Sequence, residues 1–300
     1  MSLLQKTIAS LSNSIAPVTF GAIGDAYGFC FEFATPDHVS KYNRLYYVQH
    51  PEFSHVAPGS YSDDTQMQIA LAELLASGVD WTPLTIADAF VRVFKRDPRP
   101  GYAKRFSNLL TKVQNGRELL DHLHPNSERN GAAMRAPVIG MLPEIQTVIK
   151  YATLQAQITH DTPSAIASAV AAALMSHYFV YKTGPKDELP EFLTTHLPSY
   201  DWSSPWRDPV PVHGISTVRA ALTAIMQSDS LSQLLTSCVA FNGDVDSVAT
   251  IALSCASSHR EFVRDIPIQL WQGLESTKYG IEYLAQLDNS VCRVTINKSS

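Results

Sequence analysis

The chain has 300 residues, of which 45% are hydrophobic and 17% charged, and its formal net charge is −5 at pH 7. This composition supplies enough apolar side chains for a large core and excludes a chain that is disordered throughout. The acidic balance disfavours binding through a broad basic surface, so we expect no nucleic-acid partner.

Helical periodicity dominates the sequence. Apolar residues from Met67 to Leu75 recur at the spacing of one helix face, and Gly78 is a typical stop signal for that helix. The stretch PSAIASAVAAALMSHYF, which begins at Pro163, is rich in small residues and predicts a closely packed central helix. Further apolar stripes predict helices over residues 218–226, 231–239 and 248–255.

Strand-like alternation is scarce, and its best example is VCRVTI at residues 291–296. A long loop, SYDWSSPWRDPVPVHG, occupies residues 199–214 and could separate two domains. Because helical patterns of the same character continue on both sides of this loop, we expect one all-α domain over residues 1–300.

The N-terminal segment MSLLQKTIASLSNSIAP has no long apolar stretch and predicts no signal peptide. The longest apolar stretch, residues 165–175, is shorter than the roughly 18 residues of a membrane span, so we expect no membrane association. The four cysteines have no metal-binding spacing. These features predict a cytoplasmic protein with free thiols, and we expect a monomer.

Acidic residues gather in three segments beside Gly, Ser or Asn. They are Asp25 and Glu32 in GAIGDAYGFCFEF, Ser62-Asp63-Asp64 before one predicted helix, and Asp244, Asp246 and Ser247 before another. In one interpretation each segment only caps a helix, because Asp and Ser oxygens accept hydrogen bonds from free amides there. A cap needs one oxygen, however, and each helix start offers three. Hydroxyl and carboxylate oxygens suit Mg²⁺ or Mn²⁺, so the second interpretation is a two-metal site.

Taken together, the motifs resemble the ADP-ribosylglycohydrolases. Five segments carry the resemblance in the order known for that family: GAIGDAYGFCFEF (21–33), YSDDTQMQIALAE (61–73), NGAAMRAPVIG (130–140), ITHDTPSAIASAVAAALM (158–175) and NGDVDSVATIALS (242–254). The acidic pair of the second segment followed by the spaced acidic residues of the fifth is a specific combination.

This resemblance implies an all-α, orthogonal multi-helix fold with a dinuclear centre of Mg²⁺ or Mn²⁺ in a cleft. The ligands that it implies are Ser62, Asp63, Asp64, Asp244, Asp246 and Ser247. Glu32 matches a metal-binding glutamate that moves toward substrate, and it is our candidate general acid/base. Asp64 is the second candidate catalytic residue.

The resemblance also implies substrate-binding residues, which are Gly101, Tyr102, Asn130, Gly131, Ala132, Met134, Arg135 and His160. Several of them have a plainer interpretation. Tyr102 either stacks on adenine or is an ordinary half-buried tyrosine. Arg135 either adds charge at the pyrophosphate or forms a structural salt bridge. His160 either contacts the ligand or is a capping or core histidine. Asp25 is predicted to be a turn residue rather than a support for the metal ligands.

The chain departs from the family pattern at three places, of which one, SCASSHR at residues 254–260, affects packing more than chemistry. Arg129 stands where a glycine usually precedes NGAAMR, and its side chain either constrains the loop or reaches toward the acceptor. NGDVDS replaces the usual GGDTDT, and Asn242 can adopt the left-handed conformation that glycine permits. Every ligand position is kept, which predicts an active enzyme.

The predicted activity is metal-dependent removal of ADP-ribose from a protein side chain, with arginine as the expected acceptor. ADP-ribosylserine and O-acetyl-ADP-ribose are alternative substrates of the same class. A protein that binds ADP-ribose or a toxin surface without turnover is an alternative from another class. A two-metal phosphatase or nuclease is disfavoured, because those sites are usually rich in histidines or built on strands.

Overall fold

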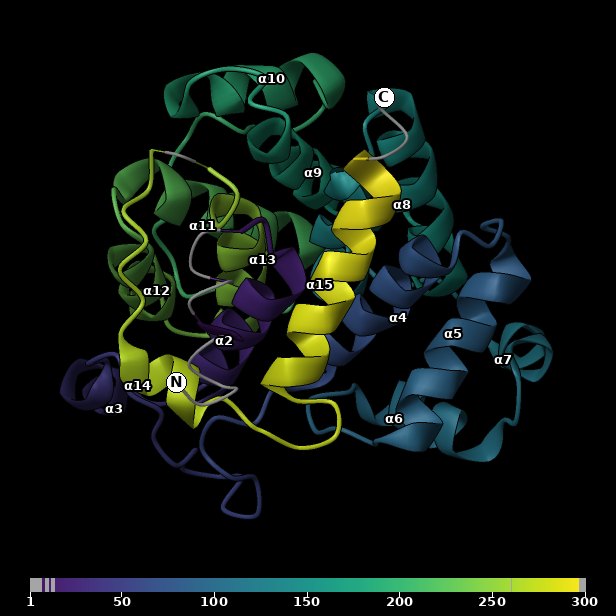
Figure 1. Cartoon of the computed structure of the whole chain (residues 1–300), viewed down its shortest axis with the longest axis horizontal. Helices are drawn as coiled ribbons and strands as arrows, with labels where there is room; N and C mark the ends of the chain where they lie inside the picture. Colours follow the sequence, from purple (N-terminus) through teal and green to yellow (C-terminus); the bar gives the residue numbers. More distant parts are fainter. Residues whose placement is uncertain (1–6, 9–10, 12–13, 260, 297–300) are drawn as a thin grey trace.

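The computed structural model describes residues 7–8, 11, 14–259 and 261–296. Within this part of the chain, regular structure consists of α-helices and short 3₁₀ helices, with isolated β-bridges in place of strands (Figure 1). The predicted all-α class is confirmed. The helices are α2 (Pro17–Phe29), α3 (Pro36–Tyr42), α4 (Asp63–Ser77), α5 (Pro83–Arg96), α6 (Lys104–Lys112), α7 (Gly116–His122), α8 (Ile145–Thr159), α9 (Pro163–Val180), α10 (Leu189–His196), α11 (Gly214–Gln227), α12 (Leu231–Ala240), α13 (Val245–Ala256), α14 (Ile268–Gly273) and α15 (Ile281–Ile296), with 3₁₀ helices η1 (Asn130–Ala132), η2 (Pro137–Met141) and η3 (Lys186–Glu188).

Helix α4 begins and ends where the sequence predicts. The Ser62 side chain accepts a hydrogen bond from the Asp64 N–H and caps the first turn. Gly78 follows the last turn with a φ of 67°, a left-handed conformation that glycine adopts without strain. The two acidic residues therefore occupy the first turn, where the helix dipole favours negative charge.

The predicted central helix is α9, and small side chains let its neighbours approach closely. It is long and apolar enough by length and composition to cross a membrane, but 78% of it is buried inside the protein. This burial is the pattern of a core helix. Buried side chains on both sides of the 199–214 loop, such as Leu174 and Val218, belong to one hydrophobic cluster.

Helices α2 and α13 touch along a stripe of glycines. A Cβ atom on Gly24 would lie 2.6 Å from the backbone carbonyl carbon of Ala249, and one on Gly28 would lie 2.8 Å from the backbone nitrogen of Asp246. A side chain at either position would therefore overlap backbone, which cannot move aside cheaply. The glycines of the GAIGDAYG segment bring α2 against the start of α13, where the spaced acidic residues lie.

The strand-like alternation at residues 291–296 does not produce a strand, because this segment forms the last turns of α15. Its alternation of apolar and polar residues is short, and it continues a helical stripe in which Ile281, Leu284 and Val291 are buried. Figure 1 shows α15, in yellow, lying across α2 and α4. Packing against these two helices decides the conformation, since local strand propensity is weak and depends on context.

A carboxylate from α15 caps the start of α2. Asp288 is buried, and it accepts hydrogen bonds from the Val18 N–H at 3.0 Å, the Thr19 N–H at 2.9 Å and the Thr19 hydroxyl at 2.6 Å. Ala16, the N-cap residue of α2, makes no capping hydrogen bond with its own side chain. The last described helix therefore satisfies the first turn of a helix near the beginning of the chain.

We expect Asp288→Asn to lower the free energy of unfolding by about 1–3 kcal/mol at pH 5, because its amide NH₂ cannot accept the hydrogen bonds of Thr19. Burial raises the pKa of Asp288 to about 7 from an ordinary value of 3.8. The unfolded wild type thus releases this proton near pH 4, and the folded protein keeps it until about pH 7. Wild-type stability at this site falls as the pH rises through that window, while asparagine does not titrate.

The stability difference between the two proteins should therefore narrow by roughly 2–4 kcal/mol between pH 4 and pH 8. Urea unfolding of both proteins at several pH values measures this change. A difference that stays constant across the range would show that the carboxyl group titrates normally in the folded protein.

Candidate functional site

Three acidic segments that are far apart in the sequence meet in the structure. Glu32 follows α2, Asp244 is the N-cap residue of α13, and Asp246 lies in the first turn of α13. One carboxylate oxygen from each of these residues lies within 4.8 Å of the others. Asp63 and Asp64, in the first turn of α4, line the same pocket. The structure therefore brings together the acidic groups that the sequence singles out.

Asp25 corrects the expectation of a turn residue. It lies inside α2, is fully buried, and its carboxylate accepts hydrogen bonds from the Ser62 N–H at 2.9 Å and the Thr65 N–H at 2.9 Å. The Thr65 hydroxyl donates a third hydrogen bond to it at 2.6 Å. Asp25 thus fixes the first turn of α4 from behind and orients the acidic pair without lining the pocket.

The side-chain oxygens of Ser62 and Asp64 at the start of α4 differ in their hydrogen bonding. The Ser62 hydroxyl oxygen is occupied as the cap, and Ser62 is absent from the residues that line the pocket. The Asp64 Oδ2 atom is buried, and no partner for it is found in the described part of the chain. A buried carboxylate oxygen without a donor is costly. Such an oxygen fits the coordination of a hard cation.

The loop that follows α5 lies against the acidic pair. The Asp63 N–H donates to the Pro100 carbonyl at 2.9 Å, and the Tyr102 hydroxyl donates to Gln66 Oε1 at 2.8 Å. Gly101 has a φ of 99°, and a Cβ atom there would overlap Asp63 Oδ1. Only glycine therefore fits at this position, and the loop closes one side of the pocket over the carboxylate.

Burial raises the pKa of every carboxyl group in the cluster, and neighbouring carboxylates add to the shift at Glu32, Asp63, Asp64 and Asp246. Burial together with the charges of Asp244 and Asp25 raises the pKa of Glu32 to about 8, although Arg129 opposes the shift. Burial raises the pKa values of Asp63, Asp64 and Asp246 well above the ordinary range, and the neighbouring carboxylates add to each shift. The pKa values of Asp25 and Asp244 are raised by burial as well. Without cations the cluster holds protons at neutral pH, and divalent cations would allow it to ionise.

The NGAAMR loop is attached directly to the acidic cluster. The Asn130 side-chain amide donates to Asp244 Oδ2 at 2.6 Å and to the Thr217 hydroxyl at 3.2 Å. Gly131 lies against the imidazole of His160, since a Cβ atom on it would lie 2.9 Å from His160 Cε1. Ala132 is buried, its carbonyl accepts a hydrogen bond from Gln155, and it does not line the pocket.

Arg135 does not form the structural salt bridge of its plainer interpretation, since no carboxylate partner for it is found in the described residues. Its Nε donates to Gln155 Oε1 at 2.5 Å, and its Nη2 donates to the Thr159 hydroxyl oxygen at 2.8 Å. The guanidinium carbon lies 4.4 Å from the centre of the Phe90 ring. Burial lowers the pKa of Arg135 to about 9. A buried cation without a carboxylate, on the wall of the pocket, is suited to an anionic ligand.

His160 is the C-cap residue of α8, and it also lines the pocket. Its Nδ1 forms a hydrogen bond with the Thr159 hydroxyl at 2.6 Å. Burial lowers the pKa of His160 to about 3, and the charges of Arg135 and Arg129 add to the shift. The imidazole is therefore neutral at physiological pH, and it can donate to or accept from a ligand without adding charge.

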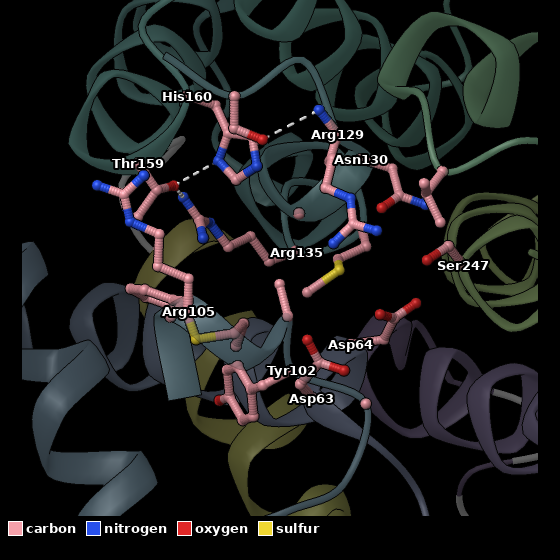
Figure 2. Close-up of a pocket in the computed structure, with 18 of the residues that line it drawn as sticks. Asp63, Asp64, Tyr102, Arg105, Arg129, Asn130, Arg135, Thr159, His160 and Ser247 are labelled. Atoms are coloured by element: carbon pink, nitrogen blue, oxygen red, sulfur yellow. Dashed lines mark hydrogen bonds between the residues drawn. The ribbon is translucent and has the colours of Figure 1, made fainter. Parts of the chain in front are cut away.

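The pocket has a volume of about 370 Å³, which lies in the range of small-molecule sites. Figure 2 shows Arg129 directed into it, toward the side that Asp63 and Asp64 occupy. Of the residues that the sequence predicts, the pocket is lined by Glu32, Asp63, Asp64, Gly101, Tyr102, Asn130, Gly131, Met134, Arg135, His160, Asp244, Asp246 and Ser247. Ser62 and Ala132 support this wall from behind.

Several residues of the pocket have no signal in the sequence. Phe33, Arg105, Phe106, Leu109 and Val212 line it, and none of them lies at a motif position that identifies a ligand contact. Phe33 belongs to the GFCFEF segment, but the apolar composition of that segment predicts that Phe33 is a core residue. Asn242 follows the prediction, because it has a φ of 64° in the turn before α13.

Comparisons with known proteins agree with this arrangement. The chain is 29% identical over 191 residues to the ADP-ribosylhydrolase ARH3 of Mus musculus, and this match covers 58% of the chain and 51% of the relative. Over 204 residues it is 28% identical to the Homo sapiens ARH3, covering 63% of the chain and 55% of that relative. The chain thus spans about half the length of these curated relatives. It is also 22% identical to the ADP-ribosyl-[dinitrogen reductase] glycohydrolase of Rhodospirillum rubrum, with 77% of the chain and 80% of that protein covered.

A solved structure has the same fold. An ADP-ribosylglycohydrolase-related protein complex superposes with a TM-score of 0.70 at 21% identity, covering 94% of the chain and 97% of its counterpart. A model of the ADP-ribosylglycohydrolase family matches residues 20–297, which include every acidic segment of the pocket. The chain therefore belongs to the ADP-ribosylglycohydrolase family.

Proposed function

We propose that the chain is a metal-dependent hydrolase that releases ADP-ribose from modified protein side chains, and that arginine is its acceptor. The observation that carries this proposal is the convergence of Glu32, Asp244 and Asp246 with the acidic start of α4 at one pocket. Family membership supports the reaction class. The acidic surroundings support the acceptor, because a guanidinium group is attracted to clustered carboxylates.

The cofactor we propose is a pair of Mg²⁺ or Mn²⁺ ions. The residues that would hold them are Asp63, Asp64, Asp244, Asp246 and Ser247, with Ser62 as a sixth candidate ligand. The fit rests on hard oxygen donors, on pKa values raised by burial and by neighbouring carboxylates, and on Asp64 Oδ2, for which the described residues offer no hydrogen-bond donor. When bound, such ions lower the pKa of water and polarise the oxygens that they contact.

Glu32 is suited to proton transfer. Its pKa of about 8 lies near the working pH, so the carboxyl group can hold a proton and release it to a leaving nitrogen or oxygen. Its backbone carbonyl accepts a hydrogen bond from His50 Nε2 at 2.9 Å, which fixes the residue at the end of α2. The chain thereby holds the proton beside the acidic cluster, where the glycosidic bond must lie.

The remaining walls bind the nucleotide part of the substrate. Gly131 lets the backbone of the NGAAMR loop approach a pyrophosphate, and Arg135 offers a buried cation on the same side. Tyr102 presents an aromatic ring that is partly buried, against which adenine can stack. These contacts orient the ribose so that its anomeric carbon faces Glu32.

An assay of free ADP-ribose tests the proposal. The purified protein is incubated with arginine-ADP-ribosylated protein in Mg²⁺, in Mn²⁺ and in EDTA, and serine-ADP-ribosylated protein and O-acetyl-ADP-ribose serve as parallel substrates. We expect release from the arginine conjugate that requires metal. Release from only the serine conjugate or O-acetyl-ADP-ribose would overturn arginine as the acceptor, while the proposed hydrolysis reaction would stand. Calorimetric binding of ADP-ribose without any release would overturn the reaction in favour of a binding protein.

A further inference from the structure

Phe33 is the exposed aromatic residue at the mouth of the pocket. It follows Glu32 directly and lines the pocket, yet 58% of the residue is accessible to solvent. Its φ of 49° lies in the left-handed region, which bulky side chains adopt rarely. A solvent-exposed ring and an unfavourable backbone conformation therefore coincide at one residue beside the acidic cluster.

Hydrogen bonds on both sides hold this conformation. The Phe33 N–H donates to the Gly243 carbonyl at 2.9 Å, which ties the residue to the turn before α13. On the other side, His50 Nδ1 accepts from the Glu52 N–H at 3.0 Å, so its Nε2 carries the proton and donates to the Glu32 carbonyl. The backbone cannot leave the left-handed conformation without straining these bonds. Strain that the surroundings enforce in this way is typical of functional sites.

The size of the pocket indicates what the ring meets. A volume of about 370 Å³ accommodates a nucleotide sugar, so a polypeptide that carries the modification must remain outside the mouth. That polypeptide leaves the pocket beside Glu32, because the bond to be cleaved lies at the acidic cluster. The next residue on this path is Phe33.

We propose that Phe33 is a specificity-determining residue whose ring contacts the acceptor polypeptide next to the ADP-ribosylated side chain. This inference rests on the proposed function and adds the recognition of a protein acceptor over a small one. An aromatic ring that becomes covered by a partner contributes apolar contact area without a large loss of side-chain freedom. The ring thus favours substrates whose modified residue is part of a chain.

Variants that accept a left-handed conformation test the ring without disturbing the backbone. Phe33→Gly and Phe33→Asn remove the ring, Phe33→Tyr retains it, and Tyr46→Ala removes an exposed aromatic side chain that does not line the pocket. KM and kcat are measured with an ADP-ribosylated protein and with ADP-ribosyl-arginine as the small conjugate. Melting temperatures show whether each variant is folded.

We expect Phe33→Gly and Phe33→Asn to raise KM for the protein substrate about 10-fold and to leave the small conjugate within about 2-fold. Phe33→Tyr and Tyr46→Ala should match the wild type on both substrates. Equal losses on the two substrates, or no loss on either, would overturn the inference while the wild-type rates keep the proposed function. A wild type that releases ADP-ribose from neither substrate would overturn the proposed function and the inference with it.

Discussion

Asp246→Ala is expected to reduce ADP-ribose release at least about 1,000-fold and, at the same time, to stabilise the metal-free protein. Activity is lost because Asp246 is one of three residues whose carboxylate oxygens lie within 4.8 Å of one another. The gain in stability comes from removing the same carboxyl group when no metal is bound. Burial, with the charges of Glu32, Asp244 and Asp64 added, raises the pKa of Asp246, so in the metal-free protein alanine removes a carboxyl group whose desolvation costs stability.

Initial rates in saturating Mg²⁺ or Mn²⁺ and melting curves in EDTA measure the two effects. A stability gain of about 1–2 kcal/mol corresponds to a rise of roughly 2–3 °C in melting temperature for a chain of this size. Asp161→Ala is the matched control, since Asp161 is exposed and does not line the pocket. Asp161→Ala should change neither the initial rate nor the melting temperature. A fully active Asp246→Ala protein would remove this residue from the metal site.

Gly28→Ala should damage both the fold and the site, although Gly28 does not line the pocket. The new Cβ atom would overlap the backbone of Asp246, with Asp246 N at 2.8 Å, so α2 and α13 would have to separate. We expect the free energy of unfolding to fall by about 2–4 kcal/mol, as in overpacked cores. The same separation moves Glu32 away from Asp246, so kcat should fall at least about 100-fold in the protein that remains folded.

Gly78→Ala provides the comparison, because Gly78 follows the last turn of α4, away from the acidic pair, and has nothing within 4 Å of an added Cβ atom. Its φ of 67° limits the cost to about 1 kcal/mol, and activity should be retained. Urea unfolding and rate measurements on both variants separate the effect of backbone conformation from the effect of the contact between α2 and α13. Equal effects of the two substitutions would show that backbone conformation, and not helix contact, decides the outcome at Gly28.

The sequence predicts the parts of the fold that depend on local pattern. The stripe from Met67 to Leu75 and the Gly78 stop give α4 its bounds, and the small residues after Pro163 give the buried helix α9. The acidic helix starts are likewise recognisable, because caps and dipoles act within one turn. What this local information leaves open is which helices meet.

The errors arise where partners distant in the sequence decide. Asp25 has the composition of a turn residue, yet it is buried in α2 because Ser62 and Thr65 satisfy its carboxylate. Arg135 is surrounded by neutral acceptors from α8, which no local pattern indicates. Asp288, near the end of the chain, caps α2, near its beginning. The backbone of Phe33 is held by a hydrogen bond from its N–H to the Gly243 carbonyl, about 210 residues away in the sequence.

The close contact of α2 with α13 also sets the order of events during synthesis. Position 28 emerges from the ribosome long before position 246, by roughly 10–40 seconds at ordinary elongation rates. During that interval the glycine face of α2 has no partner, and its fully buried neighbours Ile23 and Tyr27 stay accessible to chaperones. The nascent chain therefore carries an aggregation-prone helix until most of its length has been made, and the acidic cluster forms only after that pairing.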